Sequence, residues 1–228
     1  MSKRYQRNMM ALSPEENHRL RDFKICVAGC GGLGGYVIEE LGRLGIGFIT
    51  AIDGDVFDET NLNRQILATI NEVGCSKSEA AKNRMTAVNP DVTINAVHTM
   101  ITEENCRDLI CGHDLVVDAL DSVTARLLLE KHCEAEEIPM IHGAIAGWYG
   151  QVSVIFPGDR TLEKLYPANT VKGAEVELGN PSFIPGVVAS IQVAEALKVL
   201  LGRGNILRNK LLTVNLLDQE YEILGITG

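Results

Sequence analysis

Residues 24–34 read KICVAGCGGLG, a short apolar run followed by glycines at positions 29, 31 and 34. The apolar run is typical of a buried parallel strand, and the glycines have the G-x-G-x-x-G spacing of a turn from such a strand into a helix. Glycine permits the tight turn and lets backbone N–H groups approach a phosphate, while the N-terminal end of the helix attracts the anion. Because the same spacing also occurs in plain strand-to-helix junctions, the motif alone does not decide between the two interpretations.

The segments that follow support a nucleotide site. Residues 48–52 read FITAI, a second apolar strand, and end at Asp53, where a Rossmann-type acidic residue accepts hydrogen bonds from ribose hydroxyls. Strands and helices then alternate, with helices expected at 13–22, 76–88, 103–110 and 123–135 and strands at 92–97, 114–117 and 139–142. This order predicts an α/β fold with a Rossmann-like, doubly wound and mainly parallel sheet.

The alternation stops after residue 143. Strands expected at 151–156, 211–215 and 220–224 extend the sheet in antiparallel fashion, and an amphipathic helix is expected at 187–201. Residues 157–185, rich in glycine, proline and charge, predict a long loop or lid. The 228 residues are expected to form a single domain, 1–228, with an N-terminal helical arm (1–23), a nucleotide-binding core (24–143) and a C-terminal half (144–228).

Composition and charge narrow the class of protein. The net charge of −9 argues against a large nucleic-acid interface. The first residues, MSKRYQR, lack the apolar core of a signal peptide, and no later run is expected to span a membrane, so we expect a cytoplasmic protein. The six cysteines form no C-x-x-C pair, which argues against a disulfide framework and a cysteine zinc site and predicts reduced thiols.

The charges near the glycine turn favour a triphosphate over a dinucleotide. A dinucleotide's pyrophosphate is largely satisfied by the loop and the helix end, whereas a triphosphate needs cations close to it. Arg64, in the Asn61-Leu62-Asn63-Arg64 segment, and Lys77, at the start of a helix, could supply them, although both could also be solvated surface residues. Asp121 could either cap the next helix or hold Mg²⁺ beside a nucleotide.

Several motifs together resemble one family. They are Arg4-Tyr5-Gln6-Arg7, Gly29-Cys30-Gly31-Gly32-Leu33-Gly34, Asp53-Gly54-Asp55, Asn61-Leu62-Asn63-Arg64-Gln65, Lys77, Asn89-Pro90 and Asp118-Ala119-Leu120-Asp121. In this combination, which covers nearly the whole chain, the sequence resembles the ThiF/MoeB/HesA group, bacterial relatives of the ubiquitin-activating enzymes. The resemblance implies a homodimer that uses ATP and Mg²⁺ to adenylate the C-terminal glycine carboxylate of a small ubiquitin-fold carrier protein, with residues 144–228 forming the carrier-binding and dimer half.

The resemblance also implies roles for matching residues. Gly29, Gly31 and Gly32 would cradle phosphates, and Asp53 would hold the ribose. The residues expected to contact the triphosphate, to bind Mg²⁺ or to act in catalysis are Asn61, Arg64, Lys77, Asp121 for Mg²⁺, and Arg7, which would reach into the partner subunit's site. A carboxylate is already ionised at neutral pH, so the reaction needs cations rather than a general base.

One departure from the family concerns cysteine. Many members carry two C-x-x-C pairs that bind structural zinc, and some have a loop cysteine that forms a covalent intermediate. Residues 161–167 read TLEKLYP and contain no thiol. We therefore expect no zinc and no covalent thioester, and an external sulfur donor acting after adenylation in a thiamin- or molybdopterin-type pathway.

Other interpretations stay open. A related branch, ATP-dependent dehydratases that act on a modified tRNA, shares the Asp121-Ser122-Val123 segment, although the acidic charge and the Arg4 to Arg7 motif argue against it. The substrate could also be another carboxylate, or the chain could be a nicotinamide-dependent oxidoreductase or a binding module. The histidines, at positions 18, 98, 113, 132 and 142, lack metal-ligand spacing and are expected on the surface or satisfied in the core.

Overall fold

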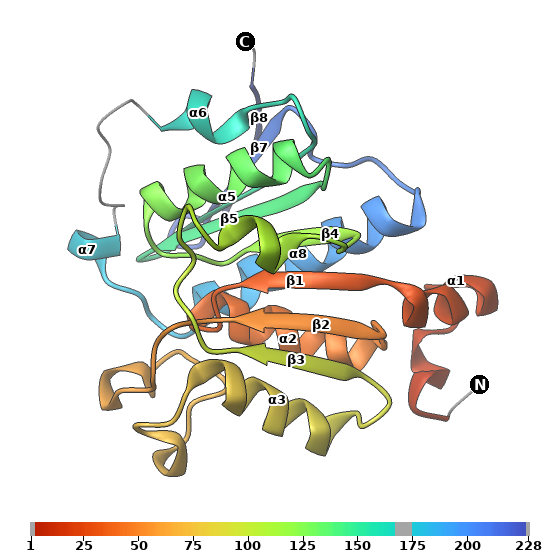
Figure 1. The fold of residues 1–228 in the computed structure, drawn as a ribbon. Helices are drawn as coiled ribbons and strands as arrows, with labels where there is room; N and C mark the ends of the chain where they lie inside the picture. Colours follow the sequence, from red (N-terminus) through yellow and green to blue (C-terminus); the bar gives the residue numbers. More distant parts are fainter. Residues whose placement is uncertain (1–2, 167–174, 227–228) are drawn as a thin grey trace.

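A single mixed sheet forms the centre of the computed structural model, which describes residues 3–166 and 175–226 (Figure 1). Its strand order is β3-β2-β1-β4-β5-β6-β7-β8. The strands are β1 Lys24–Ala28, β2 Phe48–Ile52, β3 Thr93–Val97, β4 Leu115–Asp118, β5 Met140–Ala146, β6 Tyr149–Ile155, β7 Lys210–Asn215 and β8 Glu220–Gly225. Pairs from β3 to β5 are parallel, and pairs from β5 to β8 are antiparallel. The predicted Rossmann-like fold and its antiparallel extension are confirmed.

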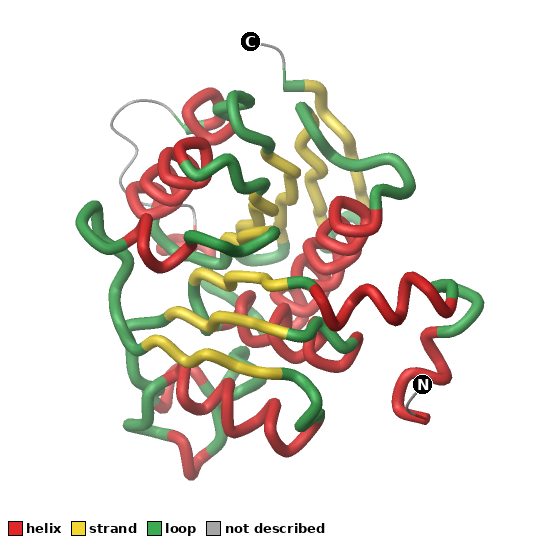
Figure 2. The backbone as a smooth tube through the Cα atoms, turned by 45° about the vertical axis from the view of Figure 1, so that its right-hand side comes forward, coloured by secondary structure: helices red, strands yellow, loops and turns green. Residues whose placement is uncertain are grey.

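Helices cover both faces of the sheet (Figure 2). They are α1 Pro14–Arg19, α2 Gly32–Leu44, α3 Lys77–Val88, α4 Cys106–Ile110, α5 Val123–Ala135, α6 Thr161–Leu165, α7 Glu175–Leu178 and α8 Phe183–Leu201, with short 3-10 turns η1 Lys3–Asn8, η2 Leu20–Asp22, η3 Glu59–Asn61 and η4 Ile70–Glu72. Side chains of β1 alternate between the two cores: Ile25 and Val27 pack into the one that contains α2 and α8, and Cys26 and Ala28 into the one that contains α4 and α5. This alternation is the two-residue period of a strand buried on both faces.

Local capping chemistry sets several helix starts. The predicted capping box at Ser13 is present, with Pro14 in the first turn and the Glu16 carboxylate accepting the Ser13 N–H. Ser76 caps α3 and Ser122 caps α5 through their hydroxyl oxygens. The two caps fix the loops that precede α3 and α5, and both loops border the candidate site.

Residues 157–185 differ from the predicted long loop. They contain α6, α7 and the first turn of α8, which begins at Phe183 rather than at residue 187; residues 167–174 lie outside the described part. The sequence pattern was misleading because Pro185 marks a helix boundary in most contexts, whereas here it occupies the first helical turn, where no backbone N–H is needed. Residues 103–105, expected at the start of a helix, form turns before α4.

Helix α8 is long and apolar enough to cross a membrane by length and composition alone, so the expectation that no run reaches that length is wrong. Half of this stretch is buried inside the protein, and the helix packs against α2, β5 and β6. A core helix of a globular domain has the same properties. Its Gln192 supports this reading, because the amide donates to the carbonyls of Asp118 and Ile141 within the core.

Candidate nucleotide-binding and catalytic site

An open pocket of about 200 Å³ lies at the carboxyl ends of β1, β2 and β4. This edge is where ligands bind in doubly wound sheets, because the strand order reverses between β1 and β4. The predicted residues that line it are Gly29, Gly31, Gly32, Asp53, Arg64, Lys77 and Asp121. Seven of the nine predicted site residues therefore meet in one pocket, and they come from three connections with the helix starts that follow them: β1–α2, β2–α3 and β4–α5.

The glycine turn needs its glycines for different reasons. Gly29 has a φ of +98°, and a Cβ there would lie 2.6 Å from the Ala119 carbonyl oxygen. At Gly34 a Cβ would lie 1.9 Å from the Gly29 carbonyl oxygen, so α2 could not pack against the turn. At Gly31, in contrast, the nearest atom is the Gln65 amide nitrogen at 3.6 Å. Gly31 is therefore not required by protein packing, and its bare backbone faces the pocket where a phosphate would approach.

Asp53 joins the end of β2 to the glycine turn. Its Oδ2 accepts the Cys30 N–H at 2.7 Å and its Oδ1 accepts the Asp55 N–H at 2.8 Å. Burial is the largest influence and raises the pKa of Asp53, while these two N–H donors and the Lys77 ammonium act in the opposite direction. Each carboxylate oxygen can accept a further hydrogen bond, so a ribose hydroxyl could join these donors.

Lys77 is not a solvated surface residue. It is 7% exposed, and its Nζ donates to the Asp55 carboxylate at 2.9 Å. The half-buried Arg64 donates through Nη1 to the Thr60 carbonyl and to the Asn63 side chain, and its stem lies over Gly32. Both cations are thus held by protein contacts at the pocket wall.

Asp121 is not the cap of the helix that follows it. Ser122 caps α5 by accepting the Ala125 N–H at 3.1 Å, whereas Asp121 is exposed and lines the pocket. Across the described residues, its carboxylate accepts no hydrogen bond, and no group of three acidic, histidine or cysteine side chains is placed to hold a metal. Such a lone carboxylate suits Mg²⁺, which proteins commonly bind through one or two carboxylates together with substrate phosphates.

Two predicted residues lie outside the pocket lining. Asn61 accepts the Asp58 N–H through its side chain and so stabilises the turn before Arg64. Arg7 is exposed on η1, whose neighbour Tyr5 packs over Gly45 at the far end of α2. Arg7 is therefore remote from the pocket of its own chain.

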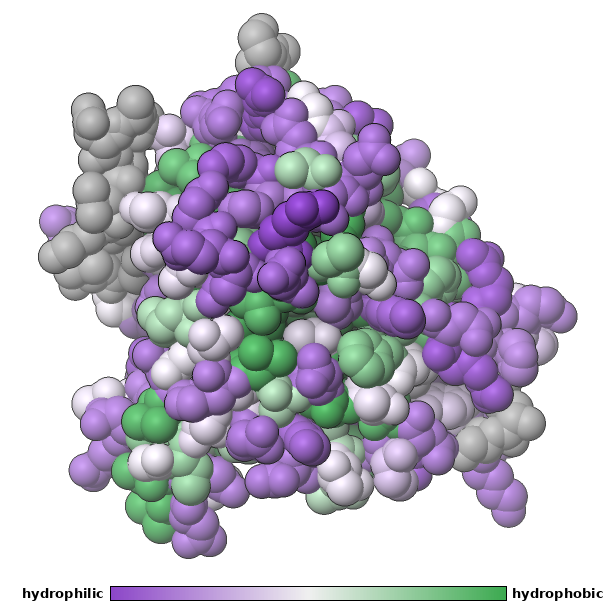
Figure 3. Space-filling view, viewed as in Figure 1, coloured by the Kyte–Doolittle hydropathy of each residue, from purple (hydrophilic) through white to green (hydrophobic). Residues whose placement is uncertain are grey.

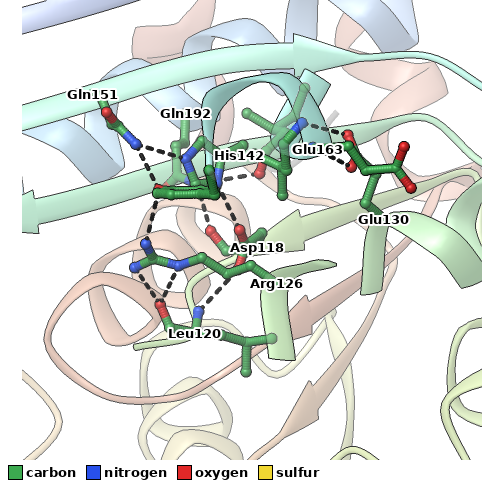
Figure 4. A network of polar contacts seen from close by, with 11 residues as sticks. Asp118, Leu120, Arg126, Glu130, His142, Gln151, Glu163 and Gln192 are labelled. Atoms are coloured by element: carbon green, nitrogen blue, oxygen red, sulfur yellow. Dashed lines mark hydrogen bonds and ion pairs between the residues drawn. The ribbon is translucent and has the colours of Figure 1, made fainter. Parts of the chain in front are cut away.

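A buried polar network behind the pocket was missed by sequence reasoning (Figure 4). His142 on β5 shares a 2.7 Å hydrogen bond with Asp118 on β4, and Gln151 on β6 contacts both His142 and the Tyr166 hydroxyl. Arg126 on α5 donates to the same hydroxyl at 3.1 Å. This network could not be predicted from spacing along the chain, because its residues come from separate helices and strands.

His142 is a satisfied core histidine, as predicted. It is fully buried, and burial lowers its pKa despite the opposing influence of Asp118. A neutral ring that donates from Nδ1 to Asp118 and accepts at Nε2 from the Gln151 amide satisfies both contacts. Cys30 is likewise buried, and burial raises the pKa of its thiol well above the usual range.

Gln65 is a further pocket residue that was not predicted to act there. It is 6% exposed, lines the pocket and packs beside Gly31, and its Oε1 has no hydrogen-bond partner among the described residues. The Oδ1 of Asn180, another residue that lines the pocket, is also unpartnered in the described structure. Buried amide oxygens are normally satisfied, so these two groups mark the pocket as a place for a polar ligand.

Comparison with known proteins places the chain in a family. The chain is 34% identical to the SAMP-activating enzyme E1 of Haloferax volcanii over 224 residues, covering 96% of this chain and 83% of the relative. It is 35% identical to the sulfur carrier protein adenylyltransferase of Thermus thermophilus (98% and 86% covered) and 34% identical to the molybdopterin-synthase adenylyltransferase of Escherichia coli (81% and 76% covered).

Solved structures agree on the fold. Escherichia coli MccB with ATP superimposes with a TM-score of 0.87 at 21% identity, covering 99% of this chain and 72% of that one. The Escherichia coli tRNA N6-threonylcarbamoyladenosine dehydratase in complex with ATP gives 0.72 at 25% identity, covering 88% and 94%. The profile of the ThiF family matches residues 5–227, and the chain therefore belongs to the ThiF family.

Proposed function

We propose that this protein is an ATP-dependent adenylyltransferase that activates the C-terminal glycine carboxylate of a small ubiquitin-like sulfur-carrier protein. One observation carries the proposal: Arg64, Lys77 and Asp121 converge with the glycine turn in one pocket of a chain 34–35% identical to named carrier-protein adenylyltransferases. A nicotinamide enzyme has no need of two cations and a free carboxylate at this place.

The reaction joins two anions. An oxygen of the carrier's terminal carboxylate attacks the α-phosphorus of ATP, the bond between the α-phosphorus and the bridging oxygen breaks, and pyrophosphate leaves with that electron pair. No proton has to move, because a terminal carboxylate has a pKa near 3.5 and is ionised at neutral pH. The protein must therefore position the reactants and neutralise charge, which is how phosphoryl-type transfer is generally accelerated.

Each pocket residue has a role in this scheme. The N–H groups of the Gly29 to Gly32 turn cradle phosphates at the start of α2, and Asp53 holds the ribose. Arg64 and Lys77 neutralise the triphosphate. Asp121 is the residue that would hold Mg²⁺, which supplies further positive charge at the phosphates when bound.

The site is completed by a second copy of the chain. Arg7 belongs to an arm that packs at the C-terminal end of α2, whereas the pocket lies at the N-terminal end of that 13-residue helix, about 20 Å away. An exposed apolar patch beside the pocket, visible at the lower left of Figure 3 around η4, supports such an interface. Its members are Val56, Ile66, Ile70 and Val73, and Ile70 is 77% exposed.

The steps after adenylation need other proteins. Cys30, in the glycine turn, is not suited to form a thioester, because it is buried and burial raises the pKa of its thiol. In our proposal the acyl adenylate passes to an external sulfur donor, without a thioester on this chain and without structural zinc. We place the reaction in the cytoplasm and in a thiamin- or molybdopterin-type pathway.

A tRNA dehydratase activity is the second candidate, since the Escherichia coli dehydratase has the same fold at 25% identity. The net charge of −9 argues against it, because tRNA binding requires several cations along a phosphate backbone. Measurable tRNA affinity with a steep salt dependence would favour this candidate.

ATP–pyrophosphate exchange tests the proposed function. We expect exchange that requires a carrier with an intact Gly-Gly tail and that falls by about a hundredfold or more in Asp121→Ala, because the Mg²⁺ ligand is lost. Arg107→Gln is the matched control, since Arg107 is exposed and pairs with Glu136 away from the pocket. Tight ATP binding without exchange, for every carrier tried, would refute the proposal.

A further inference from the structure

We propose that Arg126 binds the terminal carboxylate of the carrier and holds it at the entrance to the nucleotide pocket. This inference rests on the function proposed above, since it assigns the residue that positions the attacking carboxylate. It concerns a residue that no spacing or motif singled out in the sequence.

Arg126 is a buried cation without an acidic partner. It is 4% exposed, and across the described chain it forms no ion pair. Its partners are neutral: the Leu120 carbonyl, at 3.1 Å from Nε and 2.7 Å from Nη2, and the Tyr166 hydroxyl, at 3.1 Å from Nη1. A buried charge is normally paired, because removing it from water without a counter-ion is costly.

The guanidinium retains donors for an anion. Of its five N–H groups, three serve Leu120 and Tyr166, and one N–H remains on each terminal nitrogen. Two such N–H groups form the fork that binds a carboxylate through both of its oxygens. The three existing bonds fix the plane of the group (Figure 4), so little side-chain freedom would be lost on binding.

The position of Arg126 suits the end of a peptide. Arg126, Ala144 and Ile145 line both the nucleotide pocket and a second groove of about 510 Å³. This groove runs over β5, β6, β7 and β8, and its wall includes Tyr149, Gly150 and Gln151. An extended tail in the groove would present its last carboxylate to Arg126 at the point where the two cavities meet.

The backbone contact to Leu120 links this carboxylate site to the nucleotide. Leu120 directly precedes Asp121, so the same guanidinium that would bind the tail also holds the loop of the proposed Mg²⁺ ligand. The attacking carboxylate and the triphosphate would thus be positioned from one rigid point. Such fixed geometry is what converts bound reactants into a reactive pair.

The test is discrimination between a carboxylate and an amide at the carrier's end. Binding of the carrier and of the same carrier with a C-terminal carboxamide is measured by calorimetry in the presence of a non-hydrolysable ATP analogue. In the wild type we expect amidation to weaken binding about thirtyfold, as for loss of a charge-assisted pair. In Arg126→Gln we expect the two carriers to bind alike, and in Arg126→Lys an intermediate discrimination.

A purely structural role would give a different result. If Arg126→Gln only loosened the Asp121 loop, ATP-analogue affinity without carrier would fall while the preference for the carboxylate persisted, and the inference would be wrong. Tyr166→Phe, which keeps the guanidinium but removes one of its supports, should retain the preference. Wild-type enzyme that shows no exchange with any carrier would instead refute the proposed function itself.

Discussion

At the scale of single residues, Gly31 and Gly34 of the glycine turn serve different purposes: Gly34 is needed for folding, whereas Gly31 is expected to be needed for ATP binding. Gly34→Ala places a methyl group 1.9 Å from a backbone oxygen that cannot move, so we expect a loss of about 3 kcal/mol or more in the free energy of unfolding. Gly31→Ala has ordinary contacts and a negative φ, so its stability should stay within about 1 kcal/mol of wild type. Its ATP affinity should fall about tenfold, because the methyl group blocks the approach of a phosphate.

Urea denaturation and ATP titration of the two variants check this separation. Gly186→Ala, on α8, is a suitable control, since a Cβ there meets only the Tyr36 ring at 3.5 Å. Equal ATP affinities for Gly31→Ala and wild type would show that the glycine turn does not contact phosphates.

The residues that sequence reasoning found or missed differ in the kind of signal they carry. Gly29 and Asp53 were found because the turn and the strand end leave a local pattern. The burial of Lys77 was not foreseen, because it depends on Asp55, 22 positions away. No local sequence pattern points to Arg126, because a single polar residue within a helix is ordinarily solvated. Its proposed role follows from its burial and its partners in the folded protein.

At the scale of elements, the His142 network joins β4, β5 and β6 and should make stability depend on pH. Burial lowers the pKa of His142 in the folded protein, so below the unfolded-state pKa near 6.5 the unfolded chain binds more protons. Stability is therefore present at neutral pH and is lost as pH falls, by at most about 1.4 kcal/mol per pH unit for this one proton. We expect His142→Gln to show a shallower fall between pH 7 and pH 5.5.

Wild type and His142→Gln must be compared by the slope of the unfolding free energy against pH. The absolute free energies are not comparable, because the substitution also changes the core. Asp53 and Glu130 have pKa values raised by burial and act in the opposite direction, but they are present in both proteins. His113, whose pKa burial also lowers, contributes a similar slope to both. Identical slopes for wild type and His142→Gln would mean that the ring is not kept neutral by the fold.

Elements were predictable where their signals are local. The βα series and the Ser13 capping box depend on neighbouring residues, and the ThiF family assignment drawn from the motifs is confirmed. The C-terminal half was harder to predict from the sequence. Strand β5 was expected to end at residue 142, but it continues to Ala146 and forms a hairpin with β6. Position 143 in this strand leaves no room for a larger residue, because a Cβ there would lie 2.4 Å from the Gln192 side chain of α8. This contact joins distant segments of the chain.

At the scale of the whole molecule, the arm and the pocket lie at opposite ends of the sheet. In Figure 1 the chain starts beside α1, at the end from which β1, β2 and β3 point away, while the pocket lies at the carboxyl ends of the strands. Tyr5 fixes the arm there, because its ring packs over Gly45 and its hydroxyl oxygen accepts a 2.8 Å hydrogen bond from the Asn89 amide. If Arg7 acts in catalysis, as proposed above, it must act on a site in another copy of the chain.

This separation predicts how defective subunits complement each other. Arg7→Ala and Asp121→Ala should each abolish exchange, because every site lacks one group. When the two variants are mixed and allowed to exchange subunits, about half of the dimers pair one of each, and one of their two sites then has both groups. Exchange activity should return to about a quarter of the wild-type value.

Mixing Arg64→Ala with Asp121→Ala is the control: both defects lie in the same chain's pocket, so no intact site can form. Recovery in that control, or none in the first mixture, would contradict an arm that crosses between subunits.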